Sequence, residues 1–283
     1  MVSFTAMGVG GRELADTMNA FEVSFVRACG SLLIVLAVLP RFGLAYIRPR
    51  RIGLHLLRNC FQFMAQTLWF FSLGLLPLAT VFALEFTFPI WSAVLAAVLL
   101  GERMKRGRVA AFGMGFLGVL VIVRPGAEVF DPNSIIVLVA AIGFAVSVVG
   151  TKPLATYNTP LAIIFVMNVV HIPLGLATAV WAGWVWPTWN DLPWIAAVGI
   201  SGLTAHFCMT RAFMLADASL VLPIDYLRLP AAAGLGYLLY DERVEFALAI
   251  GAVIILAGNL YSIRYERKLR SRVETAKGGA HPE

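Results

Sequence analysis

The sequence predicts an all-α membrane protein in which ten transmembrane helices form two inverted five-helix repeats, with the first helix shortened. Three observations support this fold class: the scarcity of charge, the length of the apolar runs and an internal repeat. Of the 283 residues, 60% are hydrophobic and only 13% are charged, and the mean hydropathy is +0.83. Soluble domains are roughly 45–50% apolar and about 25% charged. So few charged residues cannot cover a water-facing surface.

The apolar runs between charged clusters have the length that a membrane-spanning helix needs. About 20 helical residues cross a bilayer core that is about 30 Å thick. Residues 81–100 and 220–240 are long runs of this kind, unlike the alternating strands of about 10 residues in a transmembrane barrel. The predicted spans are residues 1–14, 20–39, 53–74, 78–100, 108–123, 133–151, 160–181, 192–215, 220–240 and 246–263.

Positive charges are distributed unequally between the two ends of these spans. Fifteen Lys and Arg residues fall in alternate connections and in the C-terminal tail, whereas three fall in the opposite connections. Cytoplasmic loops carry the excess of Lys and Arg in multi-pass membrane proteins. We therefore expect a multi-pass protein of the cytoplasmic (inner) membrane with a cytoplasmic C-terminus. The balance of 22 Lys and Arg against 16 Asp and Glu then reflects topology and not nucleic-acid binding.

An internal repeat relates the two halves of the chain. The pair Glu102-Arg103 recurs 140 residues later as Glu242-Arg243. The same offset aligns further positions: Glu85 with Asp225, Gly118 with Gly258, Arg124 with Arg264, and Gln66 with His206. Five spans per half is an odd number, so the second copy enters from the opposite side, as in many secondary transporters. The predicted divisions are residues 1–124, 125–264 and a polar tail, 265–283. By this offset the first span would begin before Met1, so either the start codon is misassigned or the first helix is short.

Several short motifs follow one another in order along the chain. They are Phe21-Glu22 with Arg27, Pro77-Leu78-Ala79, Phe88-Pro89, Leu99-Leu100-Gly101-Glu102, Gly118-Val119 before Arg124-Pro125, and Arg211-Ala212-Phe213. This series resembles the EamA pattern of the drug/metabolite transporter superfamily over nearly the whole chain. The resemblance implies ten helices in two inverted repeats, around a central cavity lined by helices 3, 4, 8 and 9. The local motifs are similar to those of bacterial importers of S-adenosylmethionine or riboflavin type.

Ionisable side chains inside the predicted spans are the candidate site residues. Each costs about 2.5–3.5 kcal/mol on insertion scales, so such side chains usually face a cavity or a partner. Arg228 lies near the middle of its span, with Asp225 three residues earlier on the same helical face and Tyr226 between them. The planar guanidinium suits a substrate carboxylate or another anion. Alternatively, Asp225 and Arg228 form an ion pair that only fixes helix packing.

Glu85 occupies the position that the repeat matches with Asp225. A buried carboxyl group can carry a coupling proton, or it can pair with a cationic group of the substrate. Alternatively, Glu85 is a hydrogen-bonded structural residue. Proton coupling is therefore one expectation for this chain.

A polar stripe is predicted in the third span. Gln62 and Gln66 lie four residues apart and so share one helical face, and Trp69 follows them. His206 holds the matching place in the eighth span. These side chains are predicted to face the cavity, where Trp69 would stack on a ring-bearing substrate. Alternatively, the polar groups form hydrogen bonds between helices, and Trp69 packs against lipid or the core.

Other polar residues of the spans are interpreted as structural. Glu22 and Arg27 lie near the end of a predicted span, where we expect them to orient helices or to reach the lipid headgroups. Asn168 and His171 are expected to stabilise helix packing.

Two motifs of enzymes are present but poorly placed. Residues 113–118 spell GxGxxG, yet no strand precedes them, so these glycines are expected to allow close helix packing. Residues 199–202 resemble the serine motif of intramembrane rhomboid proteases. His206 lies five residues after Ser201, about 140° around the helix, and cannot easily act as its base.

The sequence thus predicts a secondary transporter that moves a small polar or amphipathic metabolite by alternating access. A GxxxxGK[ST] nucleotide motif is absent from the sequence, so ion or substrate gradients are expected to supply the energy, without a cofactor or metal. The expected partners are the small-molecule substrate and membrane lipid. The alternative is an intramembrane enzyme, such as a protease or lipid transferase, which requires a catalytic cluster.

Overall fold

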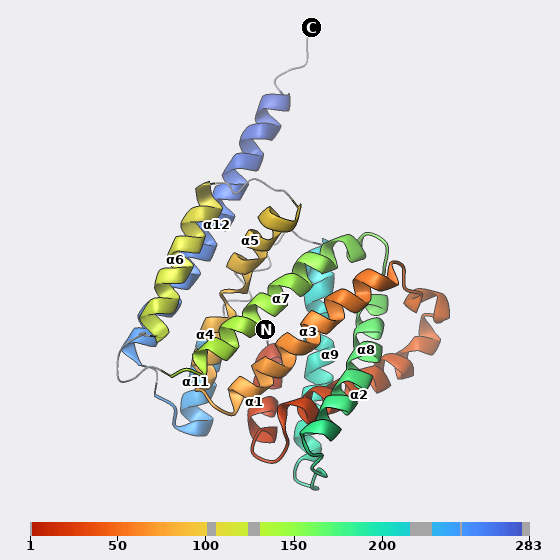
Figure 1. Ribbon diagram of the computed structural model, residues 1–283. Helices are drawn as coiled ribbons and strands as arrows, with labels where there is room; N and C mark the ends of the chain where they lie inside the picture. The colour runs from red at the N-terminus through yellow and green to blue at the C-terminus, as the bar shows by residue number, and fades with distance from the viewer. Residues whose placement is uncertain (1, 101–105, 124–130, 216–227, 244, 279–283) are drawn as a thin grey trace.

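The structure, a computed structural model, describes residues 2–100, 106–123, 131–215, 228–243 and 245–278, and every regular element in these ranges is helical (Figure 1). Short 3₁₀ helices, η1 (Leu39–Arg41) and η2 (Leu44–Ile47), follow α2. The α-helices are α1 (Val2–Leu14), α2 (Ala20–Val38), α3 (Ile52–Leu73), α4 (Leu78–Glu85), α5 (Phe88–Leu100), α6 (Arg106–Val123), α7 (Ser134–Ala155), α8 (Pro160–Ala182), α9 (Leu192–Leu215), α11 (Arg228–Tyr240) and α12 (Phe246–Gly278). The predicted all-α class is confirmed.

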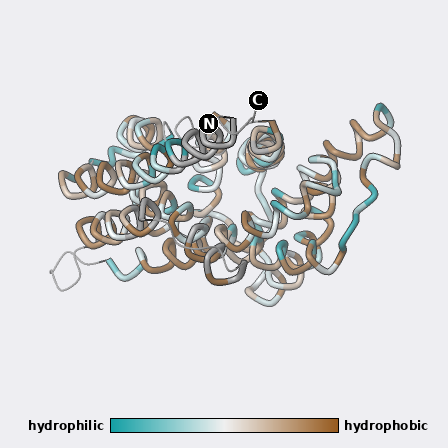
Figure 2. Tube along the Cα trace, turned by 90° about the horizontal axis from the view of Figure 1, so that it is seen from above, coloured by the Kyte–Doolittle hydropathy of each residue, from teal (hydrophilic) through white to brown (hydrophobic). Residues whose placement is uncertain are grey.

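Within the described ranges, five helices are long and apolar enough to cross a membrane. They cover Ala20–Arg41, Ser134–Ala155, Pro160–Ala182, Leu192–Ala212 and Phe246–Tyr265. Shorter apolar helices cover Leu78–Ser92 and Gly113–Ile122. Figure 2 shows apolar colouring along most of the helical turns. The count of ten spans and the inverted relation of the halves stay predictions.

The predicted fourth span is broken into two helices, α4 and α5, which is a difference from the sequence analysis. Proline lacks a backbone N–H, and its ring clashes with the carbonyl four residues earlier. Pro89 places that clash at Glu85, the last residue of α4. The carbonyl of Phe86 lies in the break and accepts a hydrogen bond from Asn259 Nδ2 of α12 at 3.1 Å. A buried side chain thus satisfies a backbone group that the broken helix leaves free.

Helices from the two halves pack against one another. α3 packs against α7 and α1 against α9, while α2 packs against α8, α4 against α11 and α6 against α12. Figure 1 shows α6 and α12 side by side, apart from the group formed by α2, α3, α8 and α9. The 140-residue offset relates α1 to α7, α2 to α8, α3 to α9 and α6 to α12. The α3–α7 pair therefore corresponds to the α9–α1 pair.

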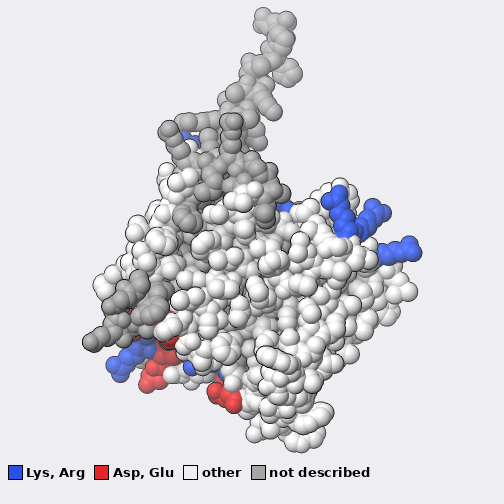
Figure 3. All heavy atoms as spheres, viewed as in Figure 1, with Lys and Arg blue, Asp and Glu red and all other residues white. Residues whose placement is uncertain are grey.

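Charged side chains gather at two ends of the molecule. Figure 3 shows Lys and Arg at the upper right, over the connection between α2 and α3, and acidic side chains together with basic ones at the lower left. The exposed arginines of the α2–α3 connection are Arg41, Arg48, Arg50 and Arg51. The middle of this face carries almost no charge, as a lipid-facing surface requires.

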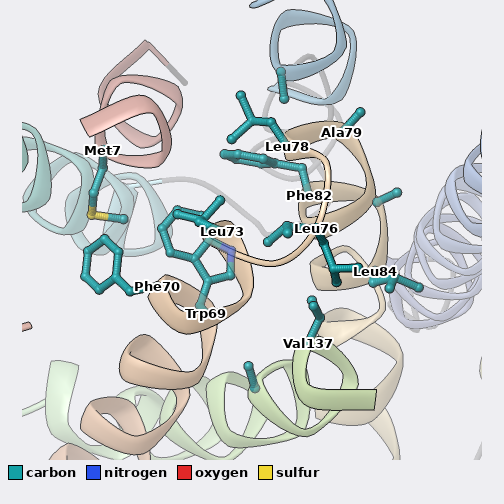
Figure 4. Packing of buried hydrophobic residues seen from close by; sticks show 14 of the residues in the cluster. Met7, Trp69, Phe70, Leu73, Leu76, Leu78, Ala79, Phe82, Leu84 and Val137 are labelled. Carbon is teal, nitrogen blue, oxygen red and sulfur yellow. The ribbon is translucent and has the colours of Figure 1, made fainter. Parts of the chain in front are cut away.

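The main apolar core lies where α1, α3, α4 and α7 meet (Figure 4). Trp69 and Phe82 are buried there and contact each other edge to face, with ring centroids 5.6 Å apart. Gly8 allows α1 to approach them, because a Cβ at this position would lie 2.9 Å from the Phe82 ring. Packing against this core turns one face of α1 toward the centre of the bundle. Phe4, one turn before Gly8, lies on that face.

The contact between α6 and α12 depends on two glycines. A Cβ on Gly118 would lie 2.7 Å from the Gly251 carbonyl oxygen, and one on Gly251 would lie 2.6 Å from the Gly118 carbonyl oxygen. Backbones approach this closely only where side chains are absent. The glycines of the GxGxxG motif therefore include one that serves close helix packing, as the sequence predicts.

Replacing Gly118 with Ala is expected to destabilise the protein by roughly 1–3 kcal/mol, since neither backbone at the contact can yield without separating the helices. Thermal unfolding of the purified protein in detergent measures the change. Gly113 on the same helix is the matched control, because a Cβ there meets nothing within 4 Å. Equal melting temperatures for the Gly118→Ala and Gly113→Ala proteins would contradict the close approach.

Candidate functional site

A buried network joins three of the predicted site residues. Arg228, the first residue of α11, is 1% exposed, and Glu85 at the end of α4 is 7% exposed. Arg228 Nη1 donates to Glu85 Oε1 at 3.3 Å. Trp69 of α3, labelled in Figure 4, donates from Nε1 to Glu85 Oε2 at 2.9 Å. Both carboxylate oxygens therefore have donors, from different helices. Asp225 and Tyr226 lie outside the described residues.

Aromatic rings surround the Arg228 guanidinium. Its Cζ lies 4.4 Å from the ring centroid of Phe4, 4.9 Å from that of Phe86 and 5.6 Å from that of Phe82. Ring faces stabilise a cation, by about 2 kcal/mol where water is excluded. Phe4 also contacts the His206 ring edge-on, with centroids 5.7 Å apart. Phe4 was not predictable as a site residue, because a phenylalanine in an apolar span carries no signal of its own.

The polar stripe of α3 points into the helix bundle. Gln62 and Gln66 are buried on the side of α3 that also carries Trp69 and Asn59. The amide Nε2 of Gln66 has no hydrogen-bond partner in the part of the chain that the structure describes. The stripe therefore faces other helices and not lipid. The Gln66 amide places an N–H donor inside the protein that has no acceptor among the described residues.

A second buried network links α2, α3, α7 and α8. Arg27 Nη2 donates to His171 Nδ1 at 2.8 Å, and His171 Nε2 lies 3.2 Å from the Asn59 carbonyl. Arginine is only a donor, so Nδ1 is the accepting nitrogen and Nε2–H donates to Asn59, which makes His171 a neutral imidazole. Arg58 donates from Nη1 to Asn59 Oδ1 at 2.7 Å and from Nε to Thr151 Oγ1 at 3.0 Å.

The expectation that Arg27 reaches lipid headgroups is wrong, because its side chain is 0% exposed. α2 begins at Ala20, so Arg27 lies about two turns inside the helix, on a face covered by α8 and α9. Glu22 does orient the start of α2. Its carboxylate accepts the Asn19 N–H at 3.0 Å, as in a capping box, and also accepts the Val185 N–H.

The two networks meet at His206. Its ring contacts Phe4, which lies against the Arg228 guanidinium, and Gly202, one turn earlier on α9, lies against Arg27. Among the described residues of the two networks, the guanidinium groups of Arg27, Arg58 and Arg228 are accompanied by one carboxylate, that of Glu85. These described residues therefore carry more positive than negative charge.

The described part of the chain lends little support to an enzyme. The hydroxyl of Ser201 donates to the Val198 carbonyl at 3.4 Å and not to a histidine. No group of three or more His, Cys, Asp and Glu among the described residues is arranged to hold a metal ion.

A pocket of about 210 Å³ lies apart from the charged networks, between α5, α6 and α7. It is lined by Thr87, Ile90, Trp91, Gly115, Phe116, Val119 and Leu138.

A separate polar cluster ties the end of α1 to the end of α11. Arg12 donates to the Leu73 carbonyl, and to that of Leu76 at 3.0 Å, and lies 3.6 Å from Glu242. Glu242 Oε2 accepts the Leu78 N–H at 2.8 Å, at the start of α4. A carboxylate in this place satisfies a free N–H and suits the positive end of the helix dipole.

Replacing Glu242 with Ala is expected to lower stability by about 0.5–2 kcal/mol, as for other lost helix caps. Thermal unfolding in detergent is the measurement. Arg243→Ala is the matched control, because Arg243 is the exposed neighbour in the same connection. If the two variants have the same melting temperature, the contact between Glu242 and α4 does not contribute to stability.

Comparison with known proteins places this geometry in a family. The model of the EamA-like transporter family matches residues 1–124 and 133–264. The S-adenosylmethionine uptake transporter of Rickettsia bellii is 28% identical over 272 residues, covering 96% of this chain and 93% of that protein. The riboflavin transporter of Rhizobium johnstonii is 29% identical over 238 residues, covering 84% of this chain and 79% of that protein.

A protein of known crystal structure has a similar fold. The TM-score is 0.66 at 20% sequence identity, over 95% of this chain and 97% of that chain. The apolar helices and the family match together make this chain an integral multi-pass membrane protein, and a transporter instead of an enzyme. It belongs to the EamA-like transporter family.

Proposed function

We propose that this protein is a secondary transporter that moves a small polar or amphipathic metabolite across the cytoplasmic (inner) membrane by alternating access. The observation that carries the proposal is the charged pair of Arg228 and Glu85, held inside an apolar bundle by residues of α3, α4 and α11. Charges at such depth are expensive. They are typical of substrate and ion pathways, and the family match supports the same reading.

The proposed architecture is ten helices in two inverted repeats, residues 1–124 and 125–264, followed by a cytoplasmic tail, residues 265–283. The equivalent packing of α3 on α7 and of α1 on α9 supports a two-fold relation between the halves. Five spans per half require the second copy to be inverted. The cluster of exposed arginines between α2 and α3 supports a cytoplasmic location for that end.

The proposed substrate is S-adenosylmethionine, with riboflavin as the second candidate, because relatives carry these names. S-adenosylmethionine has a carboxylate, two cationic groups and an aromatic base. Arg228 and Asp225 would meet its charged groups, and Trp69 and Tyr226 its ring. Gln62, Gln66 and His206 would hydrogen-bond its polar atoms, while Glu85 would bind a cationic group or carry a coupling proton.

Uptake into proteoliposomes tests this proposal. Labelled S-adenosylmethionine and riboflavin are offered separately, and the contents of the vesicles are separated by chromatography. We expect one of them to accumulate chemically unchanged, and the other to compete weakly. A converted product in the vesicles would support the intramembrane enzyme instead, and no accumulation of either compound would overturn the substrate assignment.

A further inference from the structure

Arg27 carries a buried charge without a counter-ion among the described residues. Its side chain is 0% exposed, and the group that it contacts through Nη2 is the neutral His171. Its Nε and Nη1 atoms have no hydrogen-bond partner within the described ranges. Buried charges in proteins are ordinarily paired, and intramembrane arginines usually face a partner or a pathway.

The other two buried arginines differ from Arg27 in this respect. Arg228 lies against Glu85 and three aromatic rings. Arg58 donates from both Nε and Nη1, to Thr151 and Asn59. Arg27 therefore has the least satisfied guanidinium of the three.

Further unmatched polar atoms lie on the helices around Arg27. A Cβ on Gly202 would lie 3.0 Å from Arg27 Cγ and 3.6 Å from its Nη1, so the guanidinium lies against α9 where that helix has no side chain. His206 follows one turn later on the same face of α9. Among the described residues, the unpartnered atoms on these helices include Asn59 Nδ2, Gln66 Nε2 and His206 Nε2, and also Nδ2 and Oδ1 of Asn168. Donors outnumber acceptors among these amide and ring atoms, because an amide nitrogen donates and a ring nitrogen can donate, which suits an acceptor-only group such as a carboxylate.

We propose that Arg27, together with His206 and Gln66 of the neighbouring helices α9 and α3, is the anchor for the carboxylate of the transported substrate. This inference rests on the proposed function and changes one assignment in it: the substrate's carboxylate binds Arg27 and not Arg228, because Glu85 already neutralises Arg228. The carboxylate reaches Arg27 when α2 and α9 separate during the transport cycle. These helices meet at Gly30 and Gly199, where a Cβ on either glycine would lie 3.2 Å from the Cα of the other. At the same contact, Ser31 Oγ of α2 donates to the Gly199 carbonyl at 3.0 Å, so this hydrogen bond breaks when the helices separate.

A pair of ligands that differ only in the carboxylate tests the assignment. Binding of S-adenosylmethionine and of its decarboxylated analogue is measured on the full chain in detergent. We expect the wild type to prefer S-adenosylmethionine by roughly 10- to 100-fold, as for hydrogen bonds to a charged group. Arg27→Gln is expected to remove this preference, and Arg211→Gln, which changes an exposed arginine on α9, to keep it. A full preference in folded Arg27→Gln protein overturns the proposal.

Two further measurements keep the test decisive. Where Arg27→Gln does not fold, Arg27→Lys is measured instead. Lysine retains the charge but lacks the two parallel N–H donors of the guanidinium, so we expect a smaller preference than in the wild type. An unchanged preference overturns the proposal.

Where S-adenosylmethionine neither binds nor accumulates, the substrate assignment has failed, and the binding of small anions tests the subsite. Acetate is then expected to raise the wild-type melting temperature more than acetamide or chloride, and not that of the Arg27 variant. Equal effects of acetate and chloride, or no effect, overturn the carboxylate anchor.

Discussion

Replacing Arg228 with Met is expected to lower stability by about 3–5 kcal/mol, because the buried carboxylate of Glu85 loses its counter-ion. The double change Arg228→Met with Glu85→Gln removes both charges and is expected to recover most of that stability. Uptake is expected to be lost in both proteins if the pair takes part in transport, as we propose. Thermal unfolding in detergent and uptake into proteoliposomes measure the two effects separately.

The double variant separates the two interpretations of this pair. If the pair only fixes helix packing, the double variant regains uptake together with stability, and that result would contradict a role in transport. Arg211→Met is the control, because Arg211 is an exposed arginine on α9. It is expected to match the wild type in both measurements.

Replacing Glu85 with Gln alone is expected to abolish accumulation driven by a proton gradient, while exchange of labelled for unlabelled substrate continues. The amide oxygen can accept from one of the two donors, Trp69 or Arg228, and the amide nitrogen faces the other, so one of the two contacts is lost. It cannot take up and release a proton between states. The two modes are measured in proteoliposomes with an imposed pH gradient and, separately, by counterflow.

Asp16→Asn is the control for the Glu85 variant, because Asp16 is an exposed carboxylate in the connection after α1. It is expected to retain both modes. Gradient-driven accumulation at the wild-type rate in the Glu85→Gln protein would exclude Glu85 as the proton carrier. Loss of both accumulation and exchange would assign Glu85 to substrate binding.

The helices were largely predictable from the sequence because their limits depend on local residues. α9 has the predicted bounds, Leu192–Leu215, and α2, α3 and α8 agree with the prediction to within one residue at each end. The break between α4 and α5 was missed, although Pro89 had been noted. Proline kinks some membrane helices and interrupts others. An interruption requires a partner for the carbonyl that loses its helical hydrogen bond, and here Asn259 donates to the Phe86 carbonyl.

The site was predictable only in part. Arg228 and Glu85 stood out because charges are rare in apolar spans, and the structure brings them together. Arg27 was equally visible, but its distance to the span end led to the expectation that it orients helices or reaches the lipid headgroups. Its burial depends on which side of α2 faces α8 and α9. Helical periodicity gives the spacing of side chains around one axis, but it does not give the neighbours of that axis.

The sequence by itself determined that the chain is a helical membrane protein, because hydrophobicity, span length and charge bias are sums over local residues, and it predicts two related halves. The tertiary structure alone decided which charges meet. It paired Arg228 with Glu85, placed Phe4 against both Arg228 and His206, and left part of the Arg27 guanidinium without a partner among the described residues. These contacts join residues far apart in the chain, so the packing of whole helices sets them.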